Sequence, residues 1–164
     1  MSHSVVYSEM ESPVGTLFLY ANNQGLTGLF MNTHREALPV AEKVEANENP
    51  FLAQATQELT EYFAGTRKEF SVAVDPKGTT FQRSVWAQLQ KIPCGQTISY
   101  GELAKRLGDP LLTRAVGTAN GQNPISIIIP CHRVIGANGH LTGYAGGIDK
   151  KRWLIDHEAE DTLF

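Results

Sequence analysis

Residues 123–136 read Asn-Pro-Ile-Ser-Ile-Ile-Ile-Pro-Cys-His-Arg-Val-Ile-Gly, and this stretch decides the fold expected for the second half of the chain. An apolar run ends at Pro130 and leads directly into Cys131, His132 and Arg133. A short apolar run bounded by turn residues is typical of a buried strand, so we expect an active-site strand that ends at the cysteine. The run is the longest apolar stretch of the chain and is far too short to span a bilayer, so we expect no membrane association.

Cys131 is a candidate nucleophile because cysteine reacts as the thiolate, whose formation is favoured by basic or cationic neighbours. His132 is adjacent and Arg133 is near. Adjacent residues of a strand point to opposite faces, so contact between Cys131 and His132 would need a bend or a bridging water. A buried structural cysteine remains the alternative. The one other cysteine, Cys94, lies in a predicted turn; we read it as incidental, with a disulfide between the two left open.

Upstream of this stretch, the pattern predicts three helices. Thr79 or Thr80 can cap the first, Ser99 the second over residues 100–107, and a turn at 108–110 precedes a third over residues 112–120. The last two suggest a helix-turn-helix, with a plain helical hairpin as the alternative. The third helix has an inward stripe of Leu112, Ala115, Val116 and Ala119. A second stripe consists of small residues apart from one arginine: Arg114, Gly117, Thr118 and Gly121. Small residues on an exposed helix face indicate close approach to DNA or to another helix.

The first half of the chain reads as β-structure followed by a helix. Residues 5–31 are strand-like with a turn at 22–25, residues 32–50 mix a short helix with loop, residues 51–63 are helical, and residues 70–74 alternate like a short strand. Residues 75–78 form a natural linker. We therefore predict an α/β protein of two lobes: a small sheet-plus-helix lobe over residues 1–77, and a mostly helical lobe over residues 78–164 that carries the helix-turn-helix and the cysteine strand.

Charge is unevenly distributed along the chain, although the net charge is only −3. Residues 82–152 contain nine Lys and Arg against three Asp and Glu, whereas the segments before and after are acidic. This favours a local phosphate-binding face, with an accidental asymmetry as the alternative. The sequence has no recognised metal-ligand spacing and no phosphate-cradling or dinucleotide glycine motif. We expect no metal and no cofactor.

Five blocks of the second half together carry a family resemblance. Pro130-Cys131-His132-Arg133-Val134 resembles the acceptor-cysteine motif of the O6-alkylguanine-DNA alkyltransferases. The other blocks follow the family's order and spacing: Ile98-Ser99-Tyr100-Gly101, Arg114-Ala115-Val116-Gly117, Asn123-Pro124, Gly143-Tyr144-Ala145-Gly146-Gly147, and Trp153-Leu154 with His157-Glu158. The resemblance covers residues 81–158 strongly. The first lobe resembles the family only in general character.

The resemblance implies a DNA-repair activity and a set of catalytic roles. Cys131 would accept the alkyl group irreversibly, once per molecule, and His132 would draw off its proton through a water. Glu158 would hold and polarise His132, Tyr100 would donate to N3 of the departing guanine, and Asn123 would be the hinge between the recognition helix and the cysteine strand. Each role suits its residue type.

The resemblance also implies that the damaged base is flipped out of duplex DNA through the minor groove. Arg114 would fill the gap that the base leaves, and Tyr144 would pack on the extruded base. The remaining expected contacts to DNA or substrate are Thr113, Ala115, Gly117, Thr118, Gly121, Arg133 and Ala145. Some family members carry Ser where this chain has Ala145, which puts the preferred lesion size in doubt.

The implied partner is double-stranded DNA containing O6-alkylguanine, with O4-alkylthymine as a further candidate lesion. We expect a cytoplasmic protein, associated with the nucleoid if prokaryotic, monomeric in solution and able to cluster on DNA; the sparse cysteines fit a reducing compartment. Two other classes stay open. One is a module that binds alkylguanine without repairing it, against which the presence of Cys131 argues, and the other is a Cys-His hydrolase, which would need an oxyanion hole and multiple turnovers.

Overall fold

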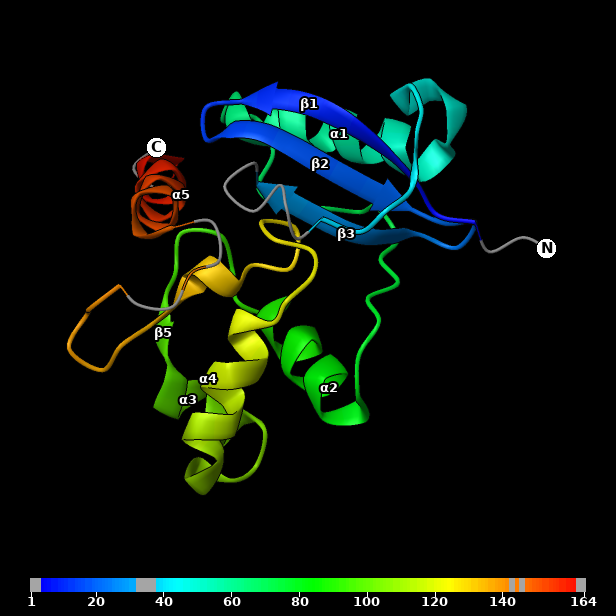
Figure 1. Ribbon diagram of the computed structural model, residues 1–164. Helices are drawn as coiled ribbons and strands as arrows, with labels where there is room; N and C mark the ends of the chain where they lie inside the picture. Colours follow the sequence, from blue (N-terminus) through cyan, green and yellow to red (C-terminus); the bar gives the residue numbers. More distant parts are fainter. Residues whose placement is uncertain (1–3, 32–37, 142–143, 145–146, 162–164) are drawn as a thin grey trace. The chain divides into compact units, whose positions relative to one another are not determined.

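The computed structural model describes residues 4–31, 38–141, 144 and 147–161 of the chain. They form two compact units, Met1–Pro76 and Lys77–Phe164, called unit 1 and unit 2 below. Unit 1 holds a sheet with one long helix, and unit 2 holds the remaining helices and two short strands (Figure 1). The predicted α/β class is confirmed. No helix among the described residues is both long and apolar enough to cross a membrane.

Unit 1 is built on a four-stranded sheet with the order β3-β2-β1-β4. The strands are β1 (Val6–Ser12), β2 (Gly15–Ala21), β3 (Leu26–Met31) and β4 (Glu42–Lys43). The first three are antiparallel neighbours, as the expected β-structure of residues 5–31 requires, and β4 pairs parallel to β1. The central strand β2 is buried over its last five residues, so it forms the middle of this unit's core.

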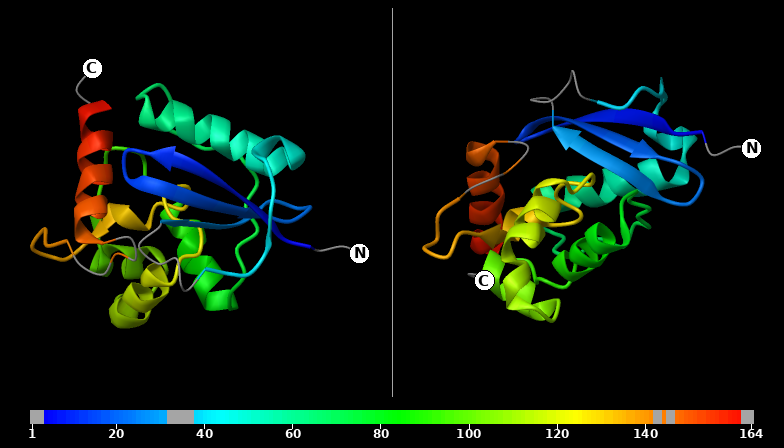
Figure 2. Two further views of the ribbon diagram at one scale, coloured as in Figure 1. Left: turned by 45° about the horizontal axis from the view of Figure 1, so that its top comes forward. Right: turned by 60° about the horizontal axis from the view of Figure 1, so that its bottom comes forward.

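Helix α1 (Pro50–Phe63) confirms the helix expected over residues 51–63 and runs along one face of the sheet (Figure 1, Figure 2). Asn49 caps it, because its side-chain oxygen accepts from the backbone N–H groups of Phe51 and Leu52 at 2.8 and 3.1 Å. A short 3-10 turn, η2 (Ala46–Glu48), precedes it. The side chains that it buries follow the helical period: Leu52, Ala55, Glu58, Leu59 and Tyr62.

The strand expected over residues 70–74 is wrong, because a buried carboxylate takes the backbone groups that a neighbouring strand would need. Glu58 accepts from the N–H groups of Ser71 and Val72 at 2.9 and 3.2 Å. Only an isolated bridge between Val74 and Leu26 remains. An apolar alternation therefore produced burial here without a strand.

Unit 2 begins with the three helices that the sequence predicted. They are α2 (Thr80–Leu89), α3 (Tyr100–Arg106) and α4 (Thr113–Gly121). Thr79 caps α2 in a capping box with Gln82, and Ser99 caps α3 through the Glu102 N–H at 3.0 Å. α3 and α4 are joined by the tight turn η3 (Pro110–Leu112) and pack on each other, as the expected helix-turn-helix requires.

Helix α2 also packs on α4. The Trp86 indole of α2 donates to the Ala119 carbonyl at 2.9 Å, which fixes α2 against α4. Two short strands, β5 (Ile98–Ser99) and β6 (Val134–Ile135), pair in parallel. The 3-10 turn η4 (Cys131–Arg133) precedes β6, and α5 (Ile148–Asp161) completes the unit.

Candidate active site

Cys131 does not end a strand, so that part of the expected fold is corrected. Residues 125–130 form a series of turns: the Ile128 N–H donates to the Ser126 carbonyl at 2.8 Å, and the Ile129 N–H to the Ile125 carbonyl at 3.0 Å. Ile127 has φ = 70°, a left-handed conformation that β-branched residues rarely adopt. Backbone hydrogen bonds within the run form turns, and Ile125 makes only an isolated bridge, so the run does not extend into a strand.

Asn123 holds this turn segment together. Its amide nitrogen donates to the carbonyls of Ile129 and Ile125 at 2.7 and 3.4 Å, and its side-chain oxygen accepts from the Ile125 N–H at 3.0 Å. The residue is buried and directly follows the C-terminal turn of α4. Its position between α4 and the cysteine segment is that of the expected hinge, and its three contacts determine where Cys131 lies.

The Cys131 thiol is buried, with 6% of the residue exposed. Burial raises the pKa of this thiol, while the Asn123 side chain and the charge of Lys151 oppose that rise. At neutral pH the resting group is therefore the thiol, and a nucleophilic role requires a base within reach. Both cysteines of the chain are free thiols, which settles the disulfide left open above.

His132 follows Cys131 on η4 and is fully buried against Glu158 of α5. Its Nε2 lies 2.7 Å from Glu158 Oε2. Burial lowers the pKa of the imidazole and outweighs the raising effect of Glu158, and the nearby charges of Arg133 and Lys151 lower the pKa further. His132 is thus neutral at pH 7, and its other ring nitrogen, Nδ1, is buried without a hydrogen-bond partner.

Arg133 completes the network around Glu158. Its Nε and Nη2 donate to the two carboxylate oxygens at 2.8 and 3.0 Å. Burial raises the pKa of the Glu158 carboxyl, but the hydrogen bonds from His132 and Arg133, together with the charge of Arg133, prevail and hold it far below its usual range. Because the carboxylate is ionised and only accepts, neutral His132 donates from Nε2 and presents Nδ1 as an acceptor.

Arg133 was expected to contact DNA or substrate, and the structure corrects this expectation. The residue is 6% exposed, and its remaining nitrogen, Nη1, donates to the Ile92 carbonyl at 2.6 Å. Three hydrogen bonds of the guanidinium therefore go to partners within unit 2. Arg133 is instead the cation that keeps Glu158 ionised.

Tyr100 begins α3 and lies against α4. A Cβ added to Gly117 would lie 3.6 Å from the ring, so the ring packs over this glycine of the recognition helix. The Nζ of Lys151 is 6.0 Å from the ring centroid. Lys151 itself is completely buried, and the sequence analysis missed it. Its spacing of seven residues before Glu158 could have placed both on one face of a helix.

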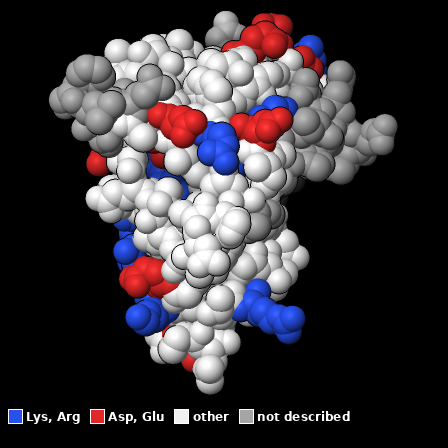
Figure 3. Space-filling view, turned by 90° about the vertical axis from the view of Figure 1, so that its left-hand side faces the viewer, with Lys and Arg blue, Asp and Glu red and all other residues white. Residues whose placement is uncertain are grey.

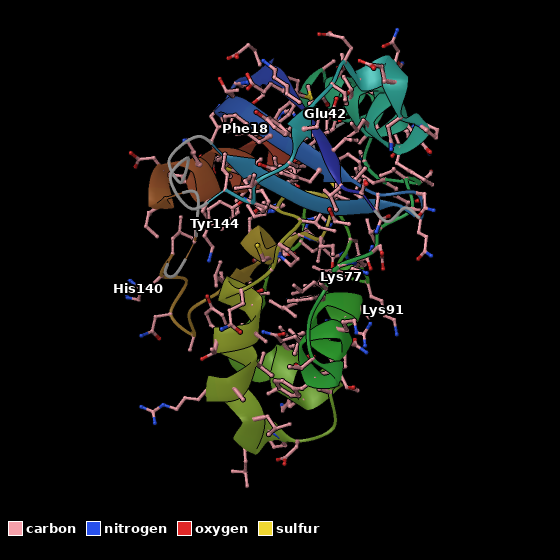
Figure 4. The ribbon with its side chains drawn as sticks, turned by 45° about the vertical axis from the view of Figure 1, so that its right-hand side comes forward. Phe18, Glu42, Lys77, Lys91, His140 and Tyr144 are labelled. Carbon is pink, nitrogen blue, oxygen red and sulfur yellow. The ribbon has the colours of Figure 1, made fainter. Side chains whose placement is uncertain are left out.

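Tyr144 lies on the connection that leads to α5, where Figure 4 labels it, and is 9% exposed. Burial raises the pKa of its hydroxyl well above the usual value, and the proximity of Cys131 adds to this, while Ser126 opposes it. Tyr144 and Cys131 are therefore neighbours. Ala145 lies outside the described residues. His140, also labelled in Figure 4, is exposed on the same connection.

The exposed face of α4 carries most of the expected DNA contacts. Thr113, Arg114, Thr118 and Gly121 are exposed, and Gly117 is half-buried beneath Tyr100. Ala115 is exposed as well, which corrects its place on the inward stripe but fits its expected place among the small surface residues. The buried residues of α4 are Val116, Ala119 and Asn120.

Basic side chains are exposed on unit 2, where Figure 3 shows them separated by wide uncharged surface. Two of the basic residues counted in the sequence, Arg133 and Lys151, are buried, and Arg106 pairs with Glu102 at 3.1 Å. The surface charge is therefore smaller than the sequence count. It rests on a short set of exposed residues: Arg83, Lys91, Lys105, Arg106, Arg114 and Arg152.

The described residues contain no group of three or more His, Cys, Asp or Glu placed to hold a metal ion. A set of buried titratable side chains of unit 2 lies around Cys131. The set consists of His132, Glu158 and Arg133, which are joined by hydrogen bonds, and of Lys151 and Tyr144.

Comparison with known families shows two domain matches that together span nearly the whole chain. Residues 5–76 match the 6-O-methylguanine DNA methyltransferase, ribonuclease-like domain, and residues 80–160 match the 6-O-methylguanine DNA methyltransferase, DNA binding domain. The chain belongs to the 6-O-methylguanine DNA methyltransferase family. The expected family is thereby confirmed, and its first-lobe domain is present too.

Relatives in this family cover both units. The methylated-DNA–protein-cysteine methyltransferase of Methanosarcina acetivorans is 47% identical over 93% of this chain and 97% of its own length. The protein of the same name from Mycobacterium tuberculosis is 46% identical over 96% and 98%. A crystal structure of Mycobacterium tuberculosis OGT in complex with DNA matches with a TM-score of 0.87 at 45% identity, covering 95% of this chain and 94% of that one. The fold is therefore that of the family throughout.

Proposed function

We propose that this protein repairs DNA by moving an alkyl group from O6 of guanine in duplex DNA onto Cys131, irreversibly and once per molecule. The observation that carries the proposal is the buried series Cys131, His132 and Glu158, in which the histidine is bound by the carboxylate at 2.7 Å and leaves Nδ1 unpartnered. Family membership and relatives named methylated-DNA–protein-cysteine methyltransferases support the same activity.

The reaction is a single displacement at the alkyl carbon. The thiol proton of Cys131 passes to His132 Nδ1, through a water, as the sulfur attacks. A carbon–sulfur bond forms, the bond between carbon and O6 breaks, and its electron pair stays with the guanine. The imidazolium that results is stabilised by ionised Glu158, which Arg133 keeps charged. A thioether does not hydrolyse, so the protein is consumed.

Tyr100 is the group that we propose to protonate or hydrogen-bond N3 of the departing base, so that guanine leaves nearly neutral. Its position at the start of α3, against Gly117 of α4, supports this because the ring lies beside the face expected to meet DNA. Tyr144, buried beside Cys131, would pack on the flipped base. Asn123 would keep the thiol in register with both.

DNA binding would use the exposed face of α4 in the minor groove. The small residues there permit close approach of the helix backbone, and Arg114 would occupy the gap left by the flipped nucleotide. Exposed basic residues of unit 2 would bind phosphates. We further propose a monomer that can cluster on DNA in the cytoplasm, where reducing conditions keep the Cys131 thiol reactive.

The decisive experiment is the intact mass of the protein after incubation with a duplex that contains one O6-methylguanine. We expect a gain of about 14 Da, one methylene, mapped to the peptide with Cys131 and saturating at one per molecule. Cys131→Ala should bind the duplex without gaining mass, and Cys94→Ala is the matched control that should react like the wild type. Residual transfer by Cys131→Ala would overturn the mechanism.

Two further measurements, of lesion binding and of ester hydrolysis, separate the other two classes. Tight lesion binding by the wild type with no change in mass would indicate a binding module. Sustained hydrolysis of a colorimetric ester by the wild type, lost in Cys131→Ala, would indicate a Cys-His hydrolase.

A further inference from the structure

The outer edge of β1 in unit 1 lacks a partner strand over most of its length. Among the described residues, β4 pairs with β1 only at Val6 and Tyr7, and the Val44 N–H donates to the Tyr7 carbonyl at 2.8 Å. The chain then leaves the sheet and enters η2, whereas β1 continues to Ser12. Residues 8–12 therefore form an open edge of the sheet, called the β1 edge below.

The backbone groups that face outward from the β1 edge follow from the pairing. The Tyr7 carbonyl points toward β4, and backbone orientation repeats at every second residue of a strand. The N–H and carbonyl groups of Glu9 and Glu11 therefore point to the same side. No described residue bonds to the backbone of either glutamate on this side. An added strand could pair with this row of donors and acceptors.

A groove of about 330 Å³ lies at the β1 edge. Its walls are residues 8–11 of β1 and residues 43–46, the segment by which the chain leaves the sheet. Ser8 lies in this wall and is 3% exposed, and its hydroxyl has no hydrogen-bond partner among the described residues. The edge thus offers space as well as unpaired hydrogen-bonding groups.

The charge along the groove is mostly negative. Its lining residues include three glutamates, Glu9, Glu11 and Glu45, and one lysine, Lys43. Lys43 lies 3.5 Å from Glu9 in an exposed pair, which water screens. Over residues 1–76 the sequence has ten Asp and Glu against four Lys and Arg. This field repels nucleic-acid phosphates and attracts basic ligands.

We propose that the β1 edge binds an extended segment of another protein in which lysine or arginine alternates with uncharged residues. The segment adds to the sheet as a further strand. Its backbone pairs with that of Glu9 and Glu11, and its basic side chains lie opposite these two carboxylates. The uncharged side chains between them lie on the other face, with Ser8 and Met10. Basic arms are common in proteins that bind nucleic acid, so a protein of that class is the partner that the charge favours.

The test measures binding of a fluorescein-labelled peptide, Lys-Thr-Lys-Thr-Lys, with Glu-Thr-Glu-Thr-Glu as the charge-reversed control. At low salt the basic peptide should bind with a Kd below about 1 mM, and the acidic peptide should not bind. In NMR spectra of the wild type, the amide signals of Glu9 and Glu11 should shift and become protected from exchange with solvent. Absence of binding, or shifts confined to other surfaces, would overturn the proposal.

Two variants separate backbone pairing from charge. Glu11→Pro removes an outward N–H that bonds to nothing in the free protein, a change that an edge strand tolerates, and should weaken peptide binding about fivefold. Glu11→Lys should weaken it by about the same factor through repulsion. Glu69→Lys reverses an exposed charge of unit 1 outside the groove and should bind like the wild type. Thermal melting and methyl transfer to Cys131 check that each variant is folded.

The remaining outcomes count against the proposal. Equal binding of the two peptides overturns it, and so does undiminished binding by folded Glu11→Pro and Glu11→Lys. A wild-type protein that dimerises through the β1 edge would assign this edge to a second copy of the chain instead. The NMR mapping uses the wild type alone, so it decides the question even if Glu11→Pro does not fold.

Discussion

Replacement of Glu158 by Gln removes one negative charge from a closed, buried network. The carboxylate receives three donors, from His132 Nε2 at 2.7 Å and from Arg133 Nε and Nη2 at 2.8 and 3.0 Å. Glutamine keeps the shape but offers one acceptor atom and two donor hydrogens. One donor of the network must then face another donor, and the Arg133 charge stays buried without its counterion.

The expected loss of stability is large, although Glu158→Gln replaces only one oxygen by a nitrogen. Removal of one partner from a buried ion pair costs about 3–5 kcal/mol, because the other charge is left uncompensated. In a protein of this length, each kcal/mol lowers Tm by about 2–4 °C, so Glu158→Gln should lower Tm by about 6–20 °C. Transfer should also slow by at least about a hundredfold, since His132 loses the acceptor that fixes its tautomer.

Thermal unfolding followed by circular dichroism at pH 7 measures the first effect, and methyl transfer by intact mass the second. Glu61→Gln is the control: Glu61 accepts from Arg67 at 2.7 Å on an exposed helix surface, and we expect no measurable change in Tm. The double variant Glu158→Leu with Arg133→Met should recover much of the stability while transfer stays lost. A Tm for Glu158→Gln within 2–3 °C of the wild type, about one kcal/mol, would refute the buried ion pair.

Four further predictions concern pH, DNA and the cysteine segment. Because burial lowers the pKa of His132, transfer should stay constant as pH falls to 6.5, the usual value for the group, and decline only below it; a decline already between pH 8 and 7 would contradict this. Stability should fall with acidification, since below pH 6.5 the unfolded chain binds a proton on His132 that the folded chain refuses, and below pH 4.5 the same holds for Glu158; a Tm that rises on acidification would be inconsistent. Arg114→Ala should slow transfer from duplex DNA at least about tenfold but leave reaction with free O6-alkylguanine base unchanged, with Lys68→Ala of unit 1 as control; equal loss on both substrates would exclude the proposed role. Asn123→Ala should lower the free energy of unfolding, measured in urea, by roughly 2–4 kcal/mol. An unchanged urea midpoint would mean that its three hydrogen bonds do not hold the turn segment.

Helices were predicted well because their signals are local. Caps at Asn49, Thr79 and Ser99 and an apolar residue every three or four positions are set by the nearest turn of chain. Strands depend on partners elsewhere in the sequence. The run at residues 125–130 and the alternation at residues 70–74 therefore predicted burial correctly and extension wrongly.

The family resemblance predicted the positions of the catalytic residues better than it predicted which charged residues are buried. Cys131, His132 and Glu158 were expected together, and the contact between histidine and carboxylate is present at 2.7 Å. Arg133 was expected to contact DNA or substrate, but it is buried against Glu158. No local signal distinguishes an arginine that binds phosphate from one that neutralises a buried carboxylate. The phosphate belongs to another molecule, and the carboxylate lies far away in the sequence.

Lys151 and Asn120 show what the sequence did not reveal, and why. Both are polar residues on helices, where a solvent-facing position is the ordinary expectation, and each is almost completely buried. Burying such groups is unfavourable unless something compensates. Lys151 lies near enough to Cys131 for its charge to oppose the rise in the thiol pKa, and Asn120 contacts the Cys131 carbonyl. Buried polar groups from two helices, α4 and α5, therefore lie around one thiol. That convergence is visible only once the fold is known, and it is what distinguishes a reactive centre from a cysteine that merely fills the core.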